Sequence, residues 1–201
     1  MNKNIFFVGA FTLLYLATAT VASLVLGNLE FLYYIAVIVI LGVIALVVDR
    51  RVHLPQSVLW ALSLWGLLHM IGGIVPLPSG LPFHGTKPVF YSLWIIPDVL
   101  KYDQLVHAYG FGVATWLCFL CLEGAMQKRI QPTVGLLALC VFAGMGLGAM
   151  NEIIEFIAVL LIPETNVGGY ENTGWDLVSN AVGAVIAALL LYRYRRNVHM
   201  E

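Results

Sequence analysis

Charged residues are scarce in this chain of 201 residues: only 10% are Asp, Glu, Lys or Arg, whereas 61% are hydrophobic. A soluble domain usually carries about 25% charged residues, so this composition excludes an ordinary soluble enzyme. The formal net charge is −1, and the ten basic residues form no stripe of the kind that binds nucleic acid. The scarcity of charge therefore predicts an integral membrane protein with no nucleic acid partner.

Cysteine is also rare, and the three cysteines all lie in apolar runs. An odd number in such settings argues against a disulfide framework. Cys118 and Cys121 form a C-x2-C pair, which alone can suggest zinc or redox chemistry. Because no second pair accompanies it, we interpret these residues as small buried hydrophobic side chains.

Several catalytic signatures are missing from the sequence. It contains no HExxH of zinc proteases, no GxSxG of serine hydrolases and no phosphatase signature. It also shows no clear inverted repeat of the kind found in many transporters. These absences leave the reaction class open.

Long apolar runs, by contrast, are abundant, and about 20 apolar residues suffice to cross the hydrocarbon core. The first run is too long for the hydrophobic region of a signal peptide, so we interpret it as a retained helix. The sequence predicts an all-α fold, a bundle of six transmembrane helices in one membrane domain, residues 1–201. The spans are expected near 5–27, 31–48, 57–76, 104–122, 133–162 and 175–192.

Basic residues are divided unequally between the two sides of this topology. One side holds Lys3, Arg50, Arg51, Lys128, Arg129, Arg193, Arg195 and Arg196, and the other holds only Lys87 and Lys101. The positive-inside rule then places both termini in the cytoplasm of a multi-pass protein of the cytoplasmic (inner) membrane. The long connection 77–101 lies outside, where the aromatic residues of VFYSLWII suit the outer interface, either as an ordered connector or as a lid.

Three short motifs place ionisable residues inside or beside the apolar runs. They are Asp103-x3-His107, Glu152-x2-Glu155 and Asp176-x3-Asn180. Ionisable residues within a bilayer are costly and usually functional. Residues three or four apart share one helix face, and the topology puts all three motifs in the outer half of the membrane. His69 lies at a comparable depth, about 10 Å before Pro76 along its helix, so we predict a polar pocket that opens outward.

Each motif lies on one helix face, and glycine residues extend that face into a stripe along the helix. They are Gly110, Gly144, Gly148 and Gly183. Small residues four apart allow membrane helices to approach closely. We therefore expect the polar stripes to face one another rather than lipid.

Most of these polar residues also have a purely structural interpretation. Asp103 and Asp176 suit caps or first-turn acids, where the helix dipole favours negative charge. His69 suits a packing residue with a hydrogen bond, and Asn180 suits a hydrogen bond between helices. For these residues the spacing leaves structural and functional roles open.

The pair Glu152 and Glu155 is harder to explain structurally. Two carboxylates one turn apart in apolar sequence repel each other if both are ionised. Either one of them is protonated, or a cation or His107 compensates the charge. We therefore predict a functional role for this pair.

At these residues the chain resembles the YjdF-type bacterial inner-membrane proteins, an uncharacterised family. The matching segments are HMIGG at 69–73, YDQLVHAYG at 102–110, NEIIEF at 151–156 and GWDLVSNAVGA at 174–184. The chain is more distantly similar to the VanZ-like group, which also shows a D-x3-H helix, a later acidic helix and a D-x3-N helix followed by glycine. That group is associated with reduced sensitivity to teicoplanin, so the resemblance implies a role in the bacterial envelope without supplying a reaction.

One hypothesis is a membrane enzyme that acts on a lipid or a lipid-linked envelope precursor. Carboxylates with one histidine suit a divalent ion of Mg, Mn, Zn or Fe. The expected metal ligands are Asp103, His107, Glu155 and Asp176. Glu152 is the expected general base, and Asn180 is expected to orient the substrate or a developing oxyanion. His69 and Tyr102 are the expected substrate contacts.

Two other hypotheses stay open, with membrane lipids as partners in each. Buried acids and histidines also form proton relays, which favours a proton- or cation-coupled transporter or flippase. The third hypothesis is a non-catalytic protein that binds a lipid or a partner. Polar contacts between membrane helices contribute on average only about 0.6 kcal/mol, which is little reason to bury four carboxylates. The glycine faces serve internal packing, a homo-oligomer or both.

Overall fold

The structure is a computed structural model that describes the backbone of residues 3–197 and the side chains of residues 5–195. Within that part of the chain, six α-helices are each long and apolar enough to cross a membrane. They are α1 (Lys3–Leu26), α2 (Leu29–Val52), α3 (Gln56–Ile74), α4 (Tyr102–Met126), α5 (Val134–Leu161) and α6 (Tyr170–Asn197). The predicted all-α class with six apolar helices is confirmed.

Local signals explain where two of these helices begin. The Asn28 side chain accepts a hydrogen bond from the Phe31 N–H at 3.2 Å and so caps α2. The Thr133 side chain does the same for α5, with the Leu136 N–H at 3.3 Å. Between α1 and α2, Gly27 has a φ of +64°, a left-handed conformation that favours glycine. The turns are therefore specified by the residues beside them.

Helix α6 begins at Tyr170, earlier than the predicted span 175–192. The residues that precede that span, YENTG at 170–174, are polar, yet they belong to the same helix. Asp176 consequently lies about 9 Å along the helix from its start, instead of at its mouth.

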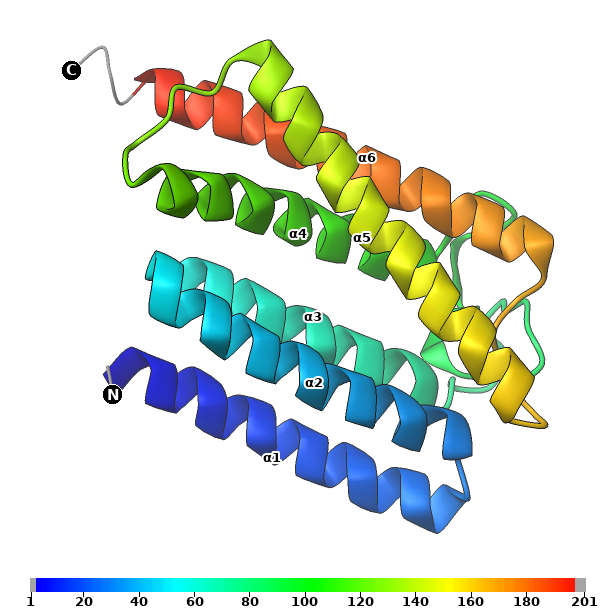
Figure 1. Ribbon diagram of the computed structural model, residues 1–201. Coiled ribbons are helices and arrows are strands. Elements are labelled where there is room, and N and C mark those ends of the chain that lie inside the picture. Colours follow the sequence, from blue (N-terminus) through cyan, green and yellow to red (C-terminus); the bar gives the residue numbers. More distant parts are fainter. Residues whose placement is uncertain (1–2, 198–201) are drawn as a thin grey trace.

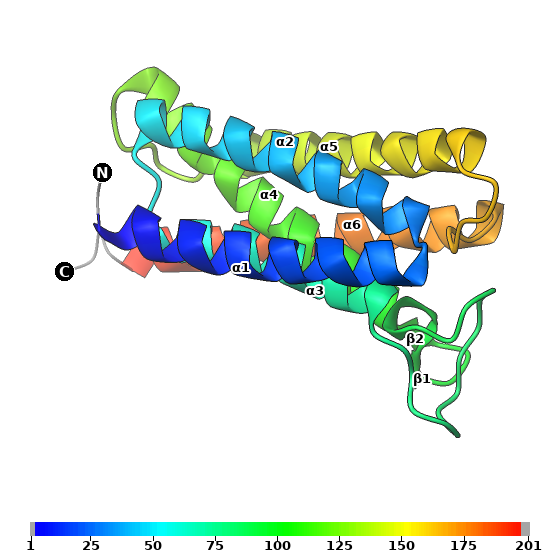
Figure 2. The same ribbon diagram turned by 90° about the horizontal axis from the view of Figure 1, so that it is seen from below.

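Helix α4 occupies the centre of the molecule. Figure 2 shows it between α2 and α5 on one face and α1, α3 and α6 on the other, and it is the most buried of the six candidate spans. Its most extensive packing is against α6. At Gly183 of α6, a Cβ would clash with the backbone carbonyl of Ala108 on α4. The two backbones are therefore in direct contact, as the small-residue stripes predict.

Helix α5 crosses α4 and α6 obliquely (Figure 1). Near its middle, Gly148 packs against the Asn180 side chain of α6, and a Cβ there would clash with that amide. Farther along, the Tyr33 hydroxyl of α2 donates to the Ile154 carbonyl oxygen at 3.2 Å. Helix α5 thus connects the α4–α6 pair to α2.

The connections group at two ends of the bundle. We call the end with segments 75–101 and 162–169 the loop end. The other, the basic end, holds the starts of α1, α3 and α5 and the ends of α2, α4 and α6 (Figure 1). Its basic residues include Arg50, Arg51, Lys128, Arg129, Arg193 and Arg195, whereas the side chains of Lys3 and Arg196 lie outside those described. Which end faces the cytoplasm stays a prediction.

The long connection at the loop end folds on itself through backbone hydrogen bonds. It contains a single turn of 3-10 helix, η1 (Phe90–Ser92), and a hairpin of β1 (Trp94–Ile96) and β2 (Leu100–Lys101), which pair antiparallel. The His84 N–H donates to the Ser92 carbonyl at 2.8 Å, and β2 continues directly into α4. The predicted interfacial segment is therefore a turn followed by a strand.

Candidate functional site

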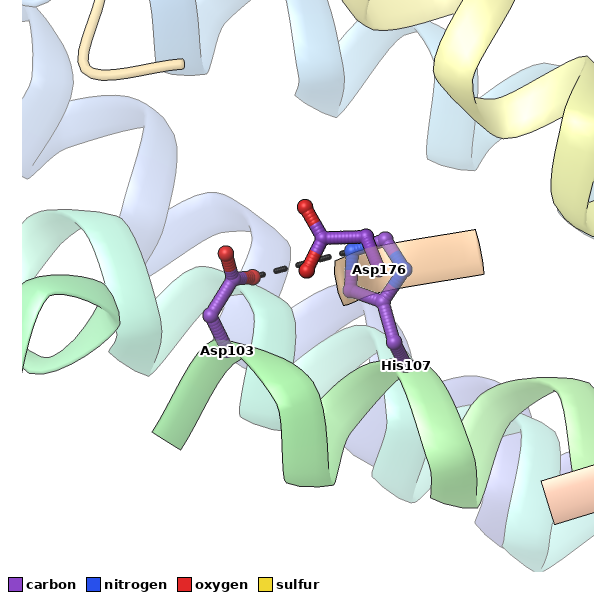
Figure 3. Close-up of side chains that lie close together, drawn as sticks. All are labelled: Asp103, His107 and Asp176. Atoms are coloured by element: carbon purple, nitrogen blue, oxygen red, sulfur yellow. Dashed lines mark ion pairs between the residues drawn. The ribbon is translucent and has the colours of Figure 1, made fainter. Parts of the chain in front are cut away.

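His107 is the centre of a polar cluster between α4, α5 and α6. The residue is 4% exposed, and its Nδ1 lies 3.0 Å from the Asn180 Oδ1 of α6. An amide oxygen can only accept, so Nδ1–H is the donor, and in the neutral tautomer that carries this proton the lone pair is on Nε2. That Nε2 lies 3.6 Å from Oδ1 of Asp103, one turn earlier on α4 (Figure 3).

Four carboxylates surround this ring. Glu152 Oε1 lies 3.6 Å from His107 Nδ1, and Glu155 Oε1 lies 3.8 Å from Nε2. Asp103 and Asp176 approach from α4 and α6, and Figure 3 shows both reaching the same side of the ring. The structure thus brings together Asp103, His107, Glu152, Glu155, Asp176 and Asn180, all six residues of the three sequence motifs.

Asn172 joins Asp103, in the first turn of α4, to Asp176 of α6. Its Nδ2 donates to Asp176 Oδ2 at 2.6 Å and to Asp103 Oδ2 at 3.4 Å. Its Oδ1 accepts a hydrogen bond of 3.0 Å from the Lys101 ammonium. One amide therefore holds both acids and connects them to the nearby lysine.

Asn151 has a similar role on α5, where its Nδ2 donates to Glu155 Oε1 at 2.8 Å. The sequence analysis missed both asparagines. Their signal is present, because Asn151 precedes Glu155 by four residues and Asn172 precedes Asp176 by four. Such spacing puts an amide donor beside a carboxylate on one helix face.

Several buried polar atoms of the cluster have no hydrogen-bond partner among the described residues. They are both carboxylate oxygens of Glu152, Oδ1 of Asp176 and Nδ2 of Asn180. Buried polar groups are nearly always hydrogen-bonded, and unpartnered charged ones are costly. A cation bound among these oxygens would satisfy them.

In each of two groups, three donor atoms also lie close enough to one another to bind an ion. Two overlapping groups have their ligand atoms within 4.8 Å of one another: Asp103, His107 and Asp176, and His107, Glu152 and Glu155. Carboxylate oxygens with one imidazole nitrogen suit Mg²⁺, Mn²⁺, Zn²⁺ or Fe²⁺. The residues therefore fit the expected divalent metal.

The two expected substrate contacts form their hydrogen bonds outside the cluster around His107. The Tyr102 hydroxyl donates to the Leu68 carbonyl of α3 at 2.9 Å, so it ties α4 to α3. The His69 ring contacts those of Tyr34 and Tyr91, and its Nδ1 forms a hydrogen bond with the Tyr91 hydroxyl. Of these two expected contacts, His69 alone lines the pocket beside the cluster.

That pocket has a volume of about 30 Å³, which accommodates one or two water-sized groups. Its lining consists of Glu30, Tyr34, His69, Tyr91, Asp103, Glu155, Asn166, Val167 and Asn172. Glu30 and Tyr34 come from α2, for which the sequence predicted only a span. The pocket therefore extends from the carboxylate cluster toward the loop end.

Tyr91 contributes to the pocket from η1, outside the six α-helices. Burial, together with the nearby charges of Asp103 and Glu155, raises the pKa of Tyr91 well above its usual value of 10. Its hydroxyl is therefore neutral at physiological pH.

Toward the basic end, the centre of the bundle becomes apolar. The buried residues of α4 that follow His107 are Gly110, Phe111, Val113, Ala114, Thr115, Phe119 and Leu120. Thr115 donates its hydroxyl to the Phe111 carbonyl at 2.7 Å, within its own helix. Among the described residues, the polar cluster around His107 therefore does not continue along α4 toward the basic end.

These features define a helical membrane protein with a buried histidine–carboxylate cluster near one end of its bundle. The chain belongs to the family described as "Predicted membrane protein (DUF2238)", whose family model matches residues 6–197. YjdF-type proteins are of this family, which supports that resemblance, whereas the VanZ-like resemblance stays a prediction. The chain matches no curated protein and no solved structure.

Proposed function

We propose that this protein is a metal-dependent membrane enzyme that acts on a lipid or a lipid-linked precursor of the bacterial envelope. The observation that carries the proposal is the convergence of four carboxylates on His107, with buried oxygens that lack partners among the described residues. A purely structural cluster would be expected to pair its charges internally. A metal centre needs those oxygens free.

The proposed metal ligands are Asp103, His107, Glu155 and Asp176. A divalent ion held there would polarise a substrate oxygen and acidify a bound water. Asn180 supports this arrangement because its Oδ1 accepts from Nδ1–H of His107, which directs the Nε2 lone pair toward Asp103 and Glu155. A ligating histidine commonly donates its other ring N–H in this way.

Glu152 and Asn180 then remain for the reaction itself. Both Glu152 carboxylate oxygens lack a hydrogen-bond partner in the described part of the chain, so they are available to accept a proton from water. The unpartnered Nδ2 of Asn180 is available to donate to charge that develops on the substrate.

The proposed location is the outer half of the cytoplasmic (inner) membrane of a bacterium. The pocket adjoins the loop end, and most basic residues lie at the other end, which the positive-inside rule assigns to the cytoplasm. A lipid headgroup in the outer leaflet would then lie level with the cluster.

The alternative, a proton- or cation-coupled transporter or flippase, draws on the same acids. A transport path also needs access from the opposite side. The apolar buried face of α4 beyond His107 counts against such a path in this conformation. We therefore favour an enzyme whose site is reached from one side of the membrane.

The decisive experiment is the metal content of the detergent-purified full chain, measured by elemental mass spectrometry. We expect about one divalent ion per chain in the wild type, retained in Glu152→Gln and lost in His107→Ala. Glu171→Gln, which changes an exposed carboxylate of α6, is the matched control and keeps the metal. No bound metal after Mg²⁺, Mn²⁺, Zn²⁺ and Fe²⁺ are supplied would refute the proposal.

A second measurement separates binding from chemistry. Metal-loaded protein is incubated with radiolabelled bacterial lipid extract, and release of soluble headgroups is counted. General bases contribute about 10²- to 10⁴-fold, so we expect Glu152→Gln to lose at least about a hundredfold in rate while keeping its metal. Full activity in that variant would exclude Glu152 as the base.

A further inference from the structure

The pocket beside the cluster has an unusual lining. It combines three rings, those of Tyr34, His69 and Tyr91, with the three carboxylates of Glu30, Asp103 and Glu155. Among the residues that the structure describes, no lysine or arginine belongs to this lining. Aromatic rings and carboxylates both attract cations.

The rings hold one another in place. The His69 ring centroid lies 5.2 Å from that of Tyr34 and 5.3 Å from that of Tyr91, and both pairs meet edge to face. Phe31 packs against both Tyr34 and His69. This part of the pocket is therefore preformed, which reduces the cost of ordering it around a ligand.

The Tyr34 hydroxyl is the most informative atom of the pocket. Tyr34 is only 5% exposed, yet its hydroxyl has no hydrogen-bond partner among the side chains and backbone that the structure describes. The Tyr91 hydroxyl, by contrast, forms a hydrogen bond with His69. A buried hydroxyl without a partner is costly, so its position in a polar pocket indicates a ligand group.

Glu30 provides charge on the same helix. It is 3% exposed, and its Oε2 accepts a hydrogen bond from the Asn166 N–H at 2.9 Å. Among the described residues this is the one hydrogen bond to the carboxylate, so Oε1 is available to a ligand. The positive charge of Lys87 attracts the Glu30 carboxylate, but the Lys87 side chain does not line the pocket.

We propose that this pocket binds a primary ammonium group and thereby selects substrates with an aminoethyl headgroup. The Tyr34 hydroxyl and Glu30 accept its N–H groups, and the rings stabilise its charge. An ammonium is about the size of a water molecule and fits a volume of about 30 Å³, whereas a trimethylammonium does not. The inference rests on the proposed function and names the substrate class of that site.

Lipid binding to the purified full chain tests the proposal, by native mass spectrometry in detergent. The probes are phosphatidylethanolamine and phosphatidylcholine with identical acyl chains, which differ by three methyl groups on nitrogen. We expect phosphatidylethanolamine to bind at least about tenfold more tightly, because the trimethylammonium group of phosphatidylcholine does not fit the pocket. Equal affinities would overturn the proposal.

Free ethanolamine, added as a competitor, distinguishes two sources of the ammonium group. Displacement of phosphatidylethanolamine by millimolar ethanolamine supports a site that also accepts a soluble amine. Lipid selectivity without displacement supports a site that requires the membrane-anchored headgroup.

Variants connect the selectivity to the pocket. Tyr34→Phe removes only the hydroxyl and should weaken phosphatidylethanolamine binding about two- to tenfold, without changing phosphatidylcholine binding. Glu30→Gln should weaken it about ten- to a hundredfold, because the lost hydrogen bond is charge-assisted. Tyr33→Phe is the matched control. The Tyr33 hydroxyl forms its hydrogen bond with Ile154 and does not line the pocket, so the selectivity should stay unchanged.

Wild-type selectivity in both Tyr34→Phe and Glu30→Gln would exclude this pocket as the ammonium site. Metal content, measured on the same samples, keeps the two proposals separate, since neither residue is a proposed metal ligand. A metal-free wild type that still selects phosphatidylethanolamine would refute only the metal centre. A metal-bound protein without headgroup preference would refute only the ammonium site.

Discussion

Helices α4 and α6 carry two largely buried charged clusters that are built in opposite ways. At the basic end, the Arg195 guanidinium lies 2.6 Å from Glu123 Oε2, and the Ile130 N–H donates to the other carboxylate oxygen at 3.0 Å. Near the loop end, four carboxylates meet His107, and some of their oxygens lack partners among the described residues. The first cluster pairs its charges internally, whereas the second leaves them for another group to neutralise.

The difference shows how this fold separates stability from function. A largely buried pair with satisfied oxygens holds two helices together and needs nothing further. A cluster with surplus negative charge destabilises the free protein, and that loss is recovered when a cation binds. Functional clusters of this kind are common sites where stability is sacrificed.

Breaking the basic-end pair should have the largest effect on stability. Glu123→Gln leaves Arg195 without its carboxylate, and we expect a loss of about 3 kcal/mol in unfolding free energy. Chemical unfolding in detergent measures it, with the exposed Glu171→Gln as control. An unchanged unfolding midpoint would mean that this pair is not structural.

Adding a divalent cation should stabilise the other cluster by nearly as much. At a concentration 100 times the Kd, a divalent ion adds about 2.7 kcal/mol, which thermal unfolding with and without chelator detects. His107→Ala should show no such gain. If the variant responds as strongly as the wild type, the ion binds elsewhere.

Removing one surplus charge should have the opposite sign from the change at Glu123. Glu152→Gln keeps the shape of the side chain but removes a buried carboxylate that accepts no hydrogen bond from the described residues, so the metal-free protein should gain about 1–2 kcal/mol. The same unfolding experiment in chelator measures it. A destabilised Glu152→Gln would show that the carboxylate is paired within the fold.

The smallest effect is expected at a residue that only supports a ligand. Asn151→Ala removes the donor to Glu155 and should lower metal affinity about tenfold, with unfolding of the metal-free protein nearly unchanged. Isothermal titration measures the affinity. Asn172→Ala tests the equivalent position on α6. Unaltered metal affinity in both variants would show that the two asparagines do not support the ligands.

The sequence predicted the six helices and the meeting of their polar stripes because both depend on local spacing. Hydropathy identifies apolar runs, and residues four apart share a face wherever the helix lies. The close contact of α4 with α6 at Gly183 follows from the same stripes. Asp176 was placed too near its helix start, because the polar first turns of α6 are invisible to hydropathy.

The contribution of α2 could not be predicted in this way. Glu30 and Tyr34 reach the pocket in a bundle where α5 crosses the α4–α6 pair obliquely and packs against α2. Crossing angles are set by how side chains of different helices interdigitate, which no spacing within one helix specifies. The direction of the Tyr102 hydroxyl, toward Leu68, likewise depends on the neighbouring helix.

The backbone contact between Gly183 and Ala108 also determines how the protein responds to its lipid surroundings. If α6 moved along α4 by about one turn, the side chain of Ser179 or Ala187 would meet the Ala108 carbonyl in place of Gly183, because residues four apart share a helix face. The two helices must therefore tilt together when the bilayer is thinner or thicker than their apolar length. The relative heights of Asp103 and His107 against Asp176 and Asn180 would then stay constant across membranes of different thickness.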